Sequence, residues 1–474
     1  MRLSTLEVLS QAEVKQIHDA TLDILAGCGV EVHNAKMLAF LKGKGLDVDE
    51  NKKIVRFTRS CMEDALASIP PRFEVFDREG APAFVLGDGN PKVAAGHNAV
   101  FWVDSETGKT RPSRVEDVAR FARICEKLDC IDMIGIPVMP QDVPDPKATL
   151  LYGVAATVKN SRKPIYFSTD SYAVNRSIID ILAAGFRGDL SKQVYGISQL
   201  SPTAPLYWEG GVIDAIMDTV ETGVPISILP EPNAGMSCPY TLAGLITVNN
   251  AECLSGLAMI QLLQPGAKVM YANSWTTTDM RTGDALVGST ETTICRIAAA
   301  QLARLYKTPS HTTAPNSDNR AHDEQNSWEK TFSMFCATAA RHDLIVNCGM
   351  FATGMTCSDE QLVMDEEISA MSRRIGEGLR VDSETIAADV IQEVGPHGSY
   401  LMHDHTLNWI RQPKEYLMPR VSVRGAKASW DAAGAKDTHA LAKEKAKKLQ
   451  AEGGCPVSAD RAARIEKIIA AFSA

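Results

Sequence analysis

The sequence predicts a (β/α)₈ barrel, with an N-terminal α+β extension and C-terminal helices around it. Eight short β-rich runs follow one another between residues 133 and 403, and stretches with helical apolar spacing separate them. Six of the seven spacings between these runs fall between roughly 30 and 43 residues. Turn signals such as Arg162-Lys163-Pro164 and Gly223-Val224-Pro225 precede the strands. Such alternation requires parallel strands with right-handed crossovers, and eight units of this kind close into a barrel.

An open doubly wound sheet would show the same alternation of strands and helices. The number of runs and the lack of a GxGxxG turn after the first of them favour the barrel. The expected strands lie at residues 133–138, 164–169, 194–200, 225–229, 268–273, 310–313, 344–350 and 400–403.

The flanking segments divide the chain into three expected parts. Residues 1–125 form the extension, in which Ser10 and Glu13 have the spacing of a capping box and several strand-like runs lie between residues 53 and 104. The barrel follows over residues 126–430, and residues 431–474 form a helical segment that ends in an amphipathic helix from Ala459 to Phe472. These helices lead us to expect a homo-oligomer.

Composition excludes several classes of function. The chain has 474 residues and a formal net charge of −9, which argues against nucleic acid as a partner. The first residues contain no apolar segment of a secretion signal, and no apolar run approaches the ~20 residues that span a bilayer. The eleven cysteines are scattered without a CxxC pair, as expected for reduced thiols. We therefore expect a cytoplasmic protein without a membrane partner.

The candidate site lies where the strands end, because barrel enzymes place their active sites in the loops after the strands. The residues at these ends are polar but mostly uncharged, with aromatic residues nearby. Two acidic residues, Glu231 and Asp318, are the candidates for a catalytic role. The candidates for substrate binding are Tyr166, Trp208, Tyr271, Trp275, Phe351, Asn233, Asn273, His311, His403 and His405.

Other barrel chemistries find less support. No strand ends in a lysine, so Schiff-base chemistry has no candidate nucleophile. A metal site remains an alternative at His403 and His405, with a third ligand such as His311, Asp318 or Cys348. We otherwise expect no metal and no cofactor bound by this chain.

Four segments, at residues 101–123, 317–330, 349–367 and 405–430, carry a family resemblance. Their motifs include Asp104-x-x-Thr107-Gly108, Trp328-Glu329-Lys330 and Gly349-Met350-Phe351, and they occur in the same order over almost the whole chain. The sequence resembles the trimethylamine methyltransferase (MttB) superfamily. Members of that family are barrels that transfer a methyl group from a methylated amine to Co(I) of a small corrinoid protein.

The resemblance implies a particular branch of the family. Founding members contain pyrrolysine, whereas this sequence has only ordinary amino acids, so it is similar to the non-pyrrolysine branch, which uses betaines. Glycine betaine is then the expected substrate, and a corrinoid protein that docks at the carboxyl-terminal face of the barrel is the expected partner. Carnitine, proline betaine, a metalloenzyme at His403 and His405, and a non-catalytic betaine-binding protein remain alternatives.

Overall fold

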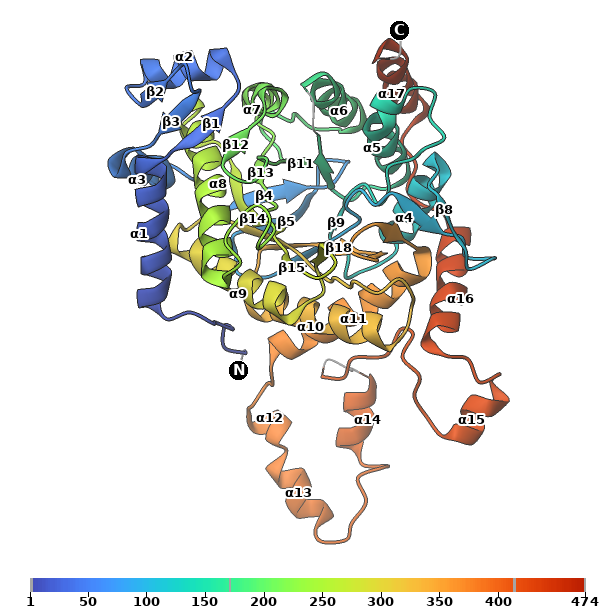
Figure 1. Ribbon diagram of the computed structural model, residues 1–474. Helices are drawn as coiled ribbons and strands as arrows, with labels where there is room; N and C mark the ends of the chain where they lie inside the picture. Colours follow the sequence, from blue (N-terminus) through green and yellow to red (C-terminus); the bar gives the residue numbers. More distant parts are fainter. Residues whose placement is uncertain (1–2, 170–171, 412–414, 473–474) are drawn as a thin grey trace.

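The computed structural model describes residues 3–169, 172–411 and 415–472, and its centre is a closed barrel of eight parallel strands. The predicted fold class is therefore confirmed (Figure 1). In chain order the barrel strands are β6 (Lys92–Ala95), β9 (Met133–Ile134), β10 (Ile165–Ser168), β11 (Gly196–Leu200), β13 (Ile226–Ile228), β14 (Val269–Asn273), β17 (Ser310–Thr313) and β18 (Leu344–Cys348). The barrel closes where β18 pairs with β6.

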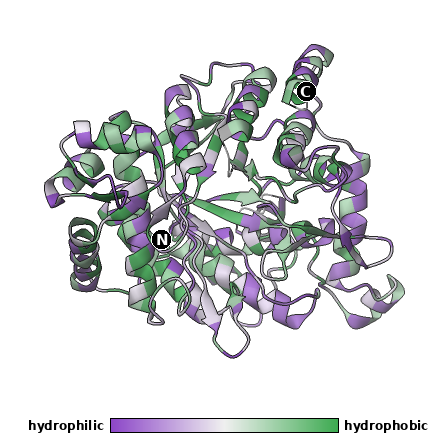
Figure 2. Ribbon diagram, turned by 45° about the horizontal axis from the view of Figure 1, so that its top comes forward, coloured by the Kyte–Doolittle hydropathy of each residue, from purple (hydrophilic) through white to green (hydrophobic). Residues whose placement is uncertain are grey.

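A helix follows each barrel strand and packs outside the barrel, as crossovers between parallel strands require. These helices are α4 (Val115–Glu126), α5 (Thr149–Asn160), α6 (Tyr172–Gly185), α7 (Gly210–Thr222), α8 (Leu242–Leu263), α9 (Thr290–Leu305), α10 (Glu324–Ala339) and α11 (Asp359–Glu377). Hydrophobic residues concentrate on the central strands, whereas the outer surfaces are mainly hydrophilic (Figure 2).

The expected assignment of strands to the barrel is wrong at both ends. The first barrel strand is β6, which lies inside the segment expected to be an extension, and the run at residues 133–138 supplies the second strand, β9. Residues 400–403 are not a strand; they precede helix α14 (Asp404–Arg411). The run Tyr400-Leu401-Met402 has strand-like composition, but β18 has already found its neighbour in β6, so the closed barrel has no edge to accept it.

The amino-terminal end of the barrel is closed by a hairpin. Strands β4 (Phe73–Phe76) and β5 (Pro82–Leu86) pair antiparallel, and Val75 bridges to Val194 just before β11. Side chains of this hairpin pack with barrel residues such as Met133, Ile197 and Met270 in one buried cluster. The barrel interior is therefore filled at this end, and open space is left at the opposite end.

The N-terminal unit packs against α8. It comprises α1 (Gln11–Gly27), β1 (Val30–Val32), α2 (Ala35–Gly43), β2 (Asp47–Asp49), β3 (Ile54–Arg56) and α3 (Arg59–Ala67), with β12 (Tyr207–Trp208) pairing with β1. The capping box predicted at Ser10 and Glu13 is present at the start of α1. By length and hydropathy α8 could cross a membrane, contrary to the expectation of no such run, but 78% of its apolar window is buried inside the protein. It is a core helix.

Short strands surround the carboxyl-terminal end of the barrel. One sheet joins β7 (Phe101–Val103), β8 (Thr110–Pro112), β19 (Met350–Phe351) and β20 (Thr356–Cys357), and a hairpin joins β15 (Thr277–Asp279) to β16 (Asp284–Leu286). After α11 come three helices, α12 (Ser383–Ile386), α13 (Ala388–Val394) and α14, followed by α15 (Lys427–Ala432), α16 (Thr438–Ala451) and α17 (Ala459–Phe472). Helix α16 packs on α11 and α4, and α17 packs on α6 and α5.

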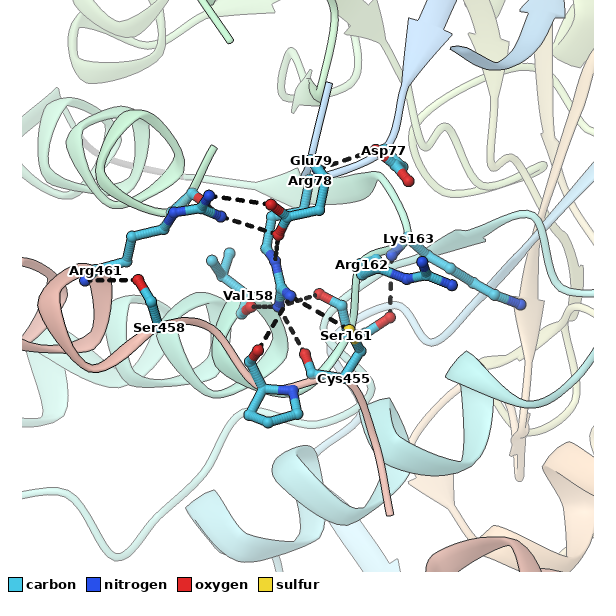
Figure 3. Close-up of polar contacts among 12 residues, drawn as sticks. Asp77, Arg78, Glu79, Val158, Ser161, Arg162, Lys163, Cys455, Ser458 and Arg461 are labelled. Atoms are coloured by element: carbon cyan, nitrogen blue, oxygen red, sulfur yellow. Dashed lines mark hydrogen bonds and ion pairs between the residues drawn. The ribbon is translucent and has the colours of Figure 1, made fainter. Parts of the chain in front are cut away.

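A buried arginine fastens the C-terminal segment to the barrel (Figure 3). The Arg78 guanidinium is 1% exposed and donates to the carbonyls of Val158, Ser161 and Cys455 at 2.8–2.9 Å, and to that of Pro456 at 3.3 Å. Its Nε lies 3.1 Å from Glu79, which also receives two hydrogen bonds from Arg461 of α17. One side chain thus ties α5, the β4–β5 turn and the chain before α17 together.

Replacement of Arg78 by methionine is expected to lower the free energy of unfolding by about 3 kcal/mol, because several carbonyls lose a charged donor in a buried place. Urea titration followed by circular dichroism measures this loss. The control is Arg464→Ala, whose side chain is 53% exposed and pairs with Asp460 one turn away on the same helix. That change should cost less than about 0.5 kcal/mol. Equal losses in the two variants would contradict the role given to Arg78.

Candidate functional site

A cavity of about 370 Å³ opens at the carboxyl-terminal end of the barrel. Its lining comes from the residues that follow the strands, where barrel enzymes carry their chemistry. The polar residues of this lining are His97, Asn98, Ser168, Gln199, Glu231, Asn233, Ser274, Thr276, Thr313, Asn316, Asn347 and Thr353. Among the described lining residues there is no lysine, arginine, tryptophan, tyrosine or phenylalanine. The cavity is therefore polar, poor in aromatic rings and nearly free of ionisable groups.

Glu231 is the carboxylate that the described lining contributes. It follows β13, and its side chain is exposed to the cavity within the mouth of the barrel, where it lines both this cavity and a neighbouring recess. This loss of bulk solvation raises the pKa of Glu231 to about 7. None of the residues that the structure describes forms an ion pair with this carboxyl group, so a cation entering the cavity would favour its charged form.

Amide side chains form a connected group on one side of the cavity. The Asn347 Nδ2 donates to Asn316 Oδ1 at 2.7 Å, and the Asn316 Nδ2 donates to the Thr313 carbonyl at 2.6 Å. The Thr276 hydroxyl donates to Asn233 Oδ1. Each amide nitrogen carries two hydrogens, so Asn316 and Asn347 retain a second donor after these bonds. The group can hydrogen-bond an anionic or carbonyl oxygen.

A second polar layer lies beneath the cavity floor. The Tyr166 hydroxyl donates to Gln199 Oε1 at 2.6 Å, and His311 Nδ1 lies 3.2 Å from that hydroxyl and 3.0 Å from Ser227 Oγ. Burial holds the pKa of His311 well below its usual value, and burial also lowers the pKa of His97 in the lining above. Both imidazoles are therefore neutral near pH 7 and add no positive charge to the site.

An adjoining recess of about 280 Å³ provides apolar surface next to Glu231. It shares Glu231 and Gln199 with the main cavity, and its other walls include Met139, Leu150 and Val212. A carboxylate thus stands between an apolar recess and a group of amides. This arrangement suits a small cation that carries methyl groups at one end and a hydrogen-bond acceptor at the other.

The structure brings only part of the predicted site together. Glu231 and Asn233 line the cavity, and Tyr166 and His311 lie directly beneath it. Of the other aromatic candidates, Trp208 donates to Ser255 of α8, Tyr271 donates to Asn250 of α8, Trp275 packs in the same buried cluster, and Phe351 contacts His322. Asn273 bonds to the His311 carbonyl and to Thr312. The aromatic cage expected from the sequence is absent from the described lining.

Three candidates have surroundings unlike those expected. Asp318 lies behind the cavity wall, where it accepts bonds from the backbone N–H of Val287 and Gly288 at 3.0 and 2.9 Å. His403 and His405 lie at the start of α14, which is not part of the barrel, so they do not end a strand. Among the described residues, no group of three or more His, Cys, Asp or Glu side chains is placed to hold a metal ion. The alternative metal site therefore lacks its ligand set.

Sequence reasoning misses most of the polar residues of the cavity, among them His97, Asn98 and Asn347. His97 and Asn98 follow β6, which is not recognised as a barrel strand, and Asn98 donates to Ser168 across the mouth. Asn347 lies at an irregularity in the pairing of β18 with β6 and has a φ of 136°. Bulges of this kind redirect a side chain next to active sites. Of His97, Asn98 and Asn347, only Asn347 is marked in the sequence, because Asn347-Cys348-Gly349 interrupts the strand-like run at residues 344–350.

The comparison with known proteins shows the family. The sequence model of the trimethylamine methyltransferase (MTTB) family matches residues 1–471. The chain belongs to this family. A trimethylamine methyltransferase of Methanosarcina thermophila is 32% identical over 456 residues, which cover 93% of this chain and 92% of the relative. A glycine betaine methyltransferase of Desulfitobacterium hafniense (strain Y51) is 29% identical over 427 residues, or 89% of this chain and 88% of that one.

A solved structure supports the fold of this trimethylamine methyltransferase family member. The crystal structure of the monomethylamine methyltransferase of Methanosarcina barkeri covers 95% of this chain and 89% of its own length, with a TM-score of 0.53 and 13% identity. At that identity the similarity concerns the fold alone.

Several residues of the family motifs brace the cavity wall from behind. The Lys330 Nζ is fully buried and lies 3.0 Å from Asp365 Oδ2, and it donates to the carbonyls of Pro315 and Met350. Asp365 also accepts from the backbone N–H of Gly349 at 2.7 Å. Pro315 precedes Asn316 and Met350 lines the cavity, so this ion pair fixes the loops after β17 and β18 relative to each other.

Proposed function

We propose that this methyltransferase takes a methyl group from a quaternary ammonium, glycine betaine in the first place, and transfers it to Co(I) of a corrinoid protein. The observation that carries the proposal is the position of Glu231, a lone carboxylate between an apolar recess and a group of amides. The similarity to a glycine betaine methyltransferase supports it. The free state of all eleven cysteines fits a reducing compartment, so we place the reaction in the cytoplasm.

The cavity suits the two ends of a betaine. The trimethylammonium group would lie against Met139, Leu150 and Val212 with Glu231 as its counter-charge. The substrate carboxylate would then face the donors of Asn316 and Asn347 on the other side. Because aromatic rings are missing from the described lining, attraction of the cation depends on the Glu231 carboxylate and not on cation–π contacts.

The nature of the leaving group explains why a quaternary ammonium needs little chemical activation by the protein. Co(I) attacks a methyl carbon with its electron pair, the C–N bond breaks, and the nitrogen leaves as a neutral tertiary amine, so no proton is delivered. A free tertiary amine would expel a poor anionic leaving group unless it were first activated. The protein must therefore hold the N–CH₃ bond in line with the acceptor and exclude water. The ion pair of Lys330 and Asp365, which fixes two loops of the cavity wall relative to each other, is consistent with such a positioning role.

The acceptor has to come from outside the barrel. We propose that the corrinoid protein docks over the carboxyl-terminal face, because the cavity opens there and the other end is closed by the β4–β5 hairpin. The exposed side chains Met236, Tyr240 and Met280 lie on loops of this face and offer apolar surface for such a contact. The corrinoid is a second substrate in this proposal, not a resident group of the chain.

The proposal is tested by mixing the purified protein with reduced cob(I)alamin and one amine at a time. With glycine betaine, methylcobalamin and dimethylglycine should form in equal amounts, and trimethylamine should be inactive. Carnitine and proline betaine, run in parallel, determine how far the cavity tolerates a larger substituent. Activity on trimethylamine alone would overturn the choice of a quaternary substrate, and binding of glycine betaine without methyl transfer would indicate a binding protein.

A further inference from the structure

The main cavity and the adjoining recess meet at a doorway inside the barrel mouth. Four of the described residues line both spaces, and we call them the doorway residues: Asn98, Ser168, Gln199 and Glu231. They lie at or just after the ends of β6, β10, β11 and β13, which are neighbours around the barrel apart from β9 between β6 and β10. A ligand with one end in the recess and the other end among the amides of the cavity must therefore pass between these four side chains.

Asn98 can reach Ser168 because the residue that follows the intervening strand β9 is a glycine. A Cβ atom on Gly135 would lie 2.2 Å from the Gly96 carbonyl oxygen, so only glycine lets the chain after β6 lie this close to the chain after β9. At this contact the Asn98 N–H donates to the Ile136 carbonyl at 2.6 Å. The Asn98 side chain then crosses to β10 and donates to the Ser168 hydroxyl. This hydrogen bond forms one side of the doorway.

Hydrogen bonds fix the width of the doorway. Gln199 accepts from the Tyr166 hydroxyl at 2.6 Å through Oε1, and its Nε2 donates to Ser201 Oγ at 3.4 Å. The backbone of Asn98 has a φ of 58°, a left-handed conformation that asparagine adopts more readily than most residues. Because the backbone and the side chain of Asn98 are both hydrogen-bonded, the doorway can widen only if hydrogen bonds inside the site are broken, which costs free energy.

We propose that Asn98 and Ser168 determine which betaine is accepted, because they limit the width of the link between the ammonium and carboxylate ends of the substrate. The inference rests on the proposed function, in which the ammonium group occupies the recess and the carboxylate faces the amides of the cavity. In glycine betaine the link is a single CH₂ group, which passes between the doorway residues. The link of proline betaine is part of a ring, so its extra carbon atoms press against Asn98 and Ser168. Such a clash rejects a ligand whose two ends the site would otherwise hold equally well.

The test compares the dissociation constants of glycine betaine and proline betaine, measured by isothermal titration calorimetry on the full-length protein. The wild type should bind glycine betaine about tenfold more tightly or better, as expected for a misfit of a few carbon atoms. Asn98→Gly removes the crossing side chain and keeps a residue suited to the positive φ, so this preference should fall to about threefold or less. Ser168→Ala removes only the hydroxyl that holds Asn98, and it should lower the preference in the same direction by about threefold.

Asn51→Gly makes the same chemical change at an exposed position of the N-terminal unit and should keep the wild-type preference. Circular dichroism checks that each variant is folded, and if Asn98→Gly does not fold, Ser168→Ala decides by itself. A wild type that binds the two betaines equally, or a folded Asn98→Gly variant that keeps the wild-type preference, would overturn the role of the doorway and leave the proposed function standing. A wild type that binds neither betaine would overturn the proposed function, and the doorway role with it.

Discussion

Replacement of Glu231 by glutamine is expected to lower kcat/KM for glycine betaine by about 30- to 150-fold, equivalent to about 2–3 kcal/mol. Glutamine keeps the shape of the side chain but removes the negative charge that faces the cation. The loss should appear mainly as a higher KM, since the positive charge on nitrogen falls as the methyl group leaves. Initial rates of methylcobalamin formation over a range of betaine concentrations measure the two constants separately.

The pH dependence provides a second readout of the same carboxyl group. Its raised pKa of about 7 means that Glu231 is neutral below pH 7 and charged above it. The wild-type KM should therefore rise as the pH falls below about 7, whereas the KM of the glutamine variant should stay high and constant. The control Glu209→Gln, which changes an exposed carboxylate at the start of α7, should match the wild type within a factor of about two. A glutamine variant that retains the wild-type KM and pH profile would contradict this role.

Replacement of Lys330 by methionine should lower the free energy of unfolding by about 3–5 kcal/mol. The change leaves Asp365 buried without its cation and removes the donor that joins the Pro315 and Met350 carbonyls. Because these carbonyls belong to the loops that carry Asn316 and line the cavity, turnover should also fall in the protein that remains folded. Urea unfolding and the rate per folded molecule measure the two effects.

Two further variants separate the buried ion pair from a general effect of losing a lysine. The double variant Lys330→Met, Asp365→Leu removes both charges and should recover much of the lost stability, since no unpaired charge stays in the interior. Lys427→Met changes a lysine that is 78% exposed, forms an ion pair with Asp431 and lies over the ring of Trp430, and it should cost less than about 1 kcal/mol. A loss below about 1 kcal/mol in Lys330→Met would show that the pair does not brace the wall.

The periodic features of the fold could be predicted from the sequence. Strand runs, turns and helix starts are local signals, and the capping box at Ser10 and Glu13 and seven of the barrel strands were found in this way. The remaining strand, β6, has only the short run Lys-Val-Ala-Ala, which carries little β propensity. What makes it a barrel strand is its pairing with β18 and β9, which are distant in sequence.

The site could be predicted only in part because a strand presents alternate residues to opposite faces. Met270 of β14 packs inside the barrel, whereas Tyr271 of the same strand reaches outward to Asn250 of α8. Tyr271 and Trp275 therefore belong to the packing between barrel and helices, although both lie close to a strand end. Glu231 and Asn233 were identified because they follow β13 in a loop, where position alone brings a side chain to the mouth. Whether the candidates within the strands face the barrel interior or the surrounding helices depends on the register of each strand, which composition does not reveal.

The most direct test of the central claim is a crystal structure of the protein with glycine betaine bound. We predict the trimethylammonium group beside the Glu231 carboxylate, with one methyl group directed toward the opening of the cavity and the substrate carboxylate within hydrogen-bonding distance of Asn316 or Asn347. A betaine bound outside the barrel mouth, or one with its own carboxylate against Glu231 and its methyl groups among the amides, would contradict the account.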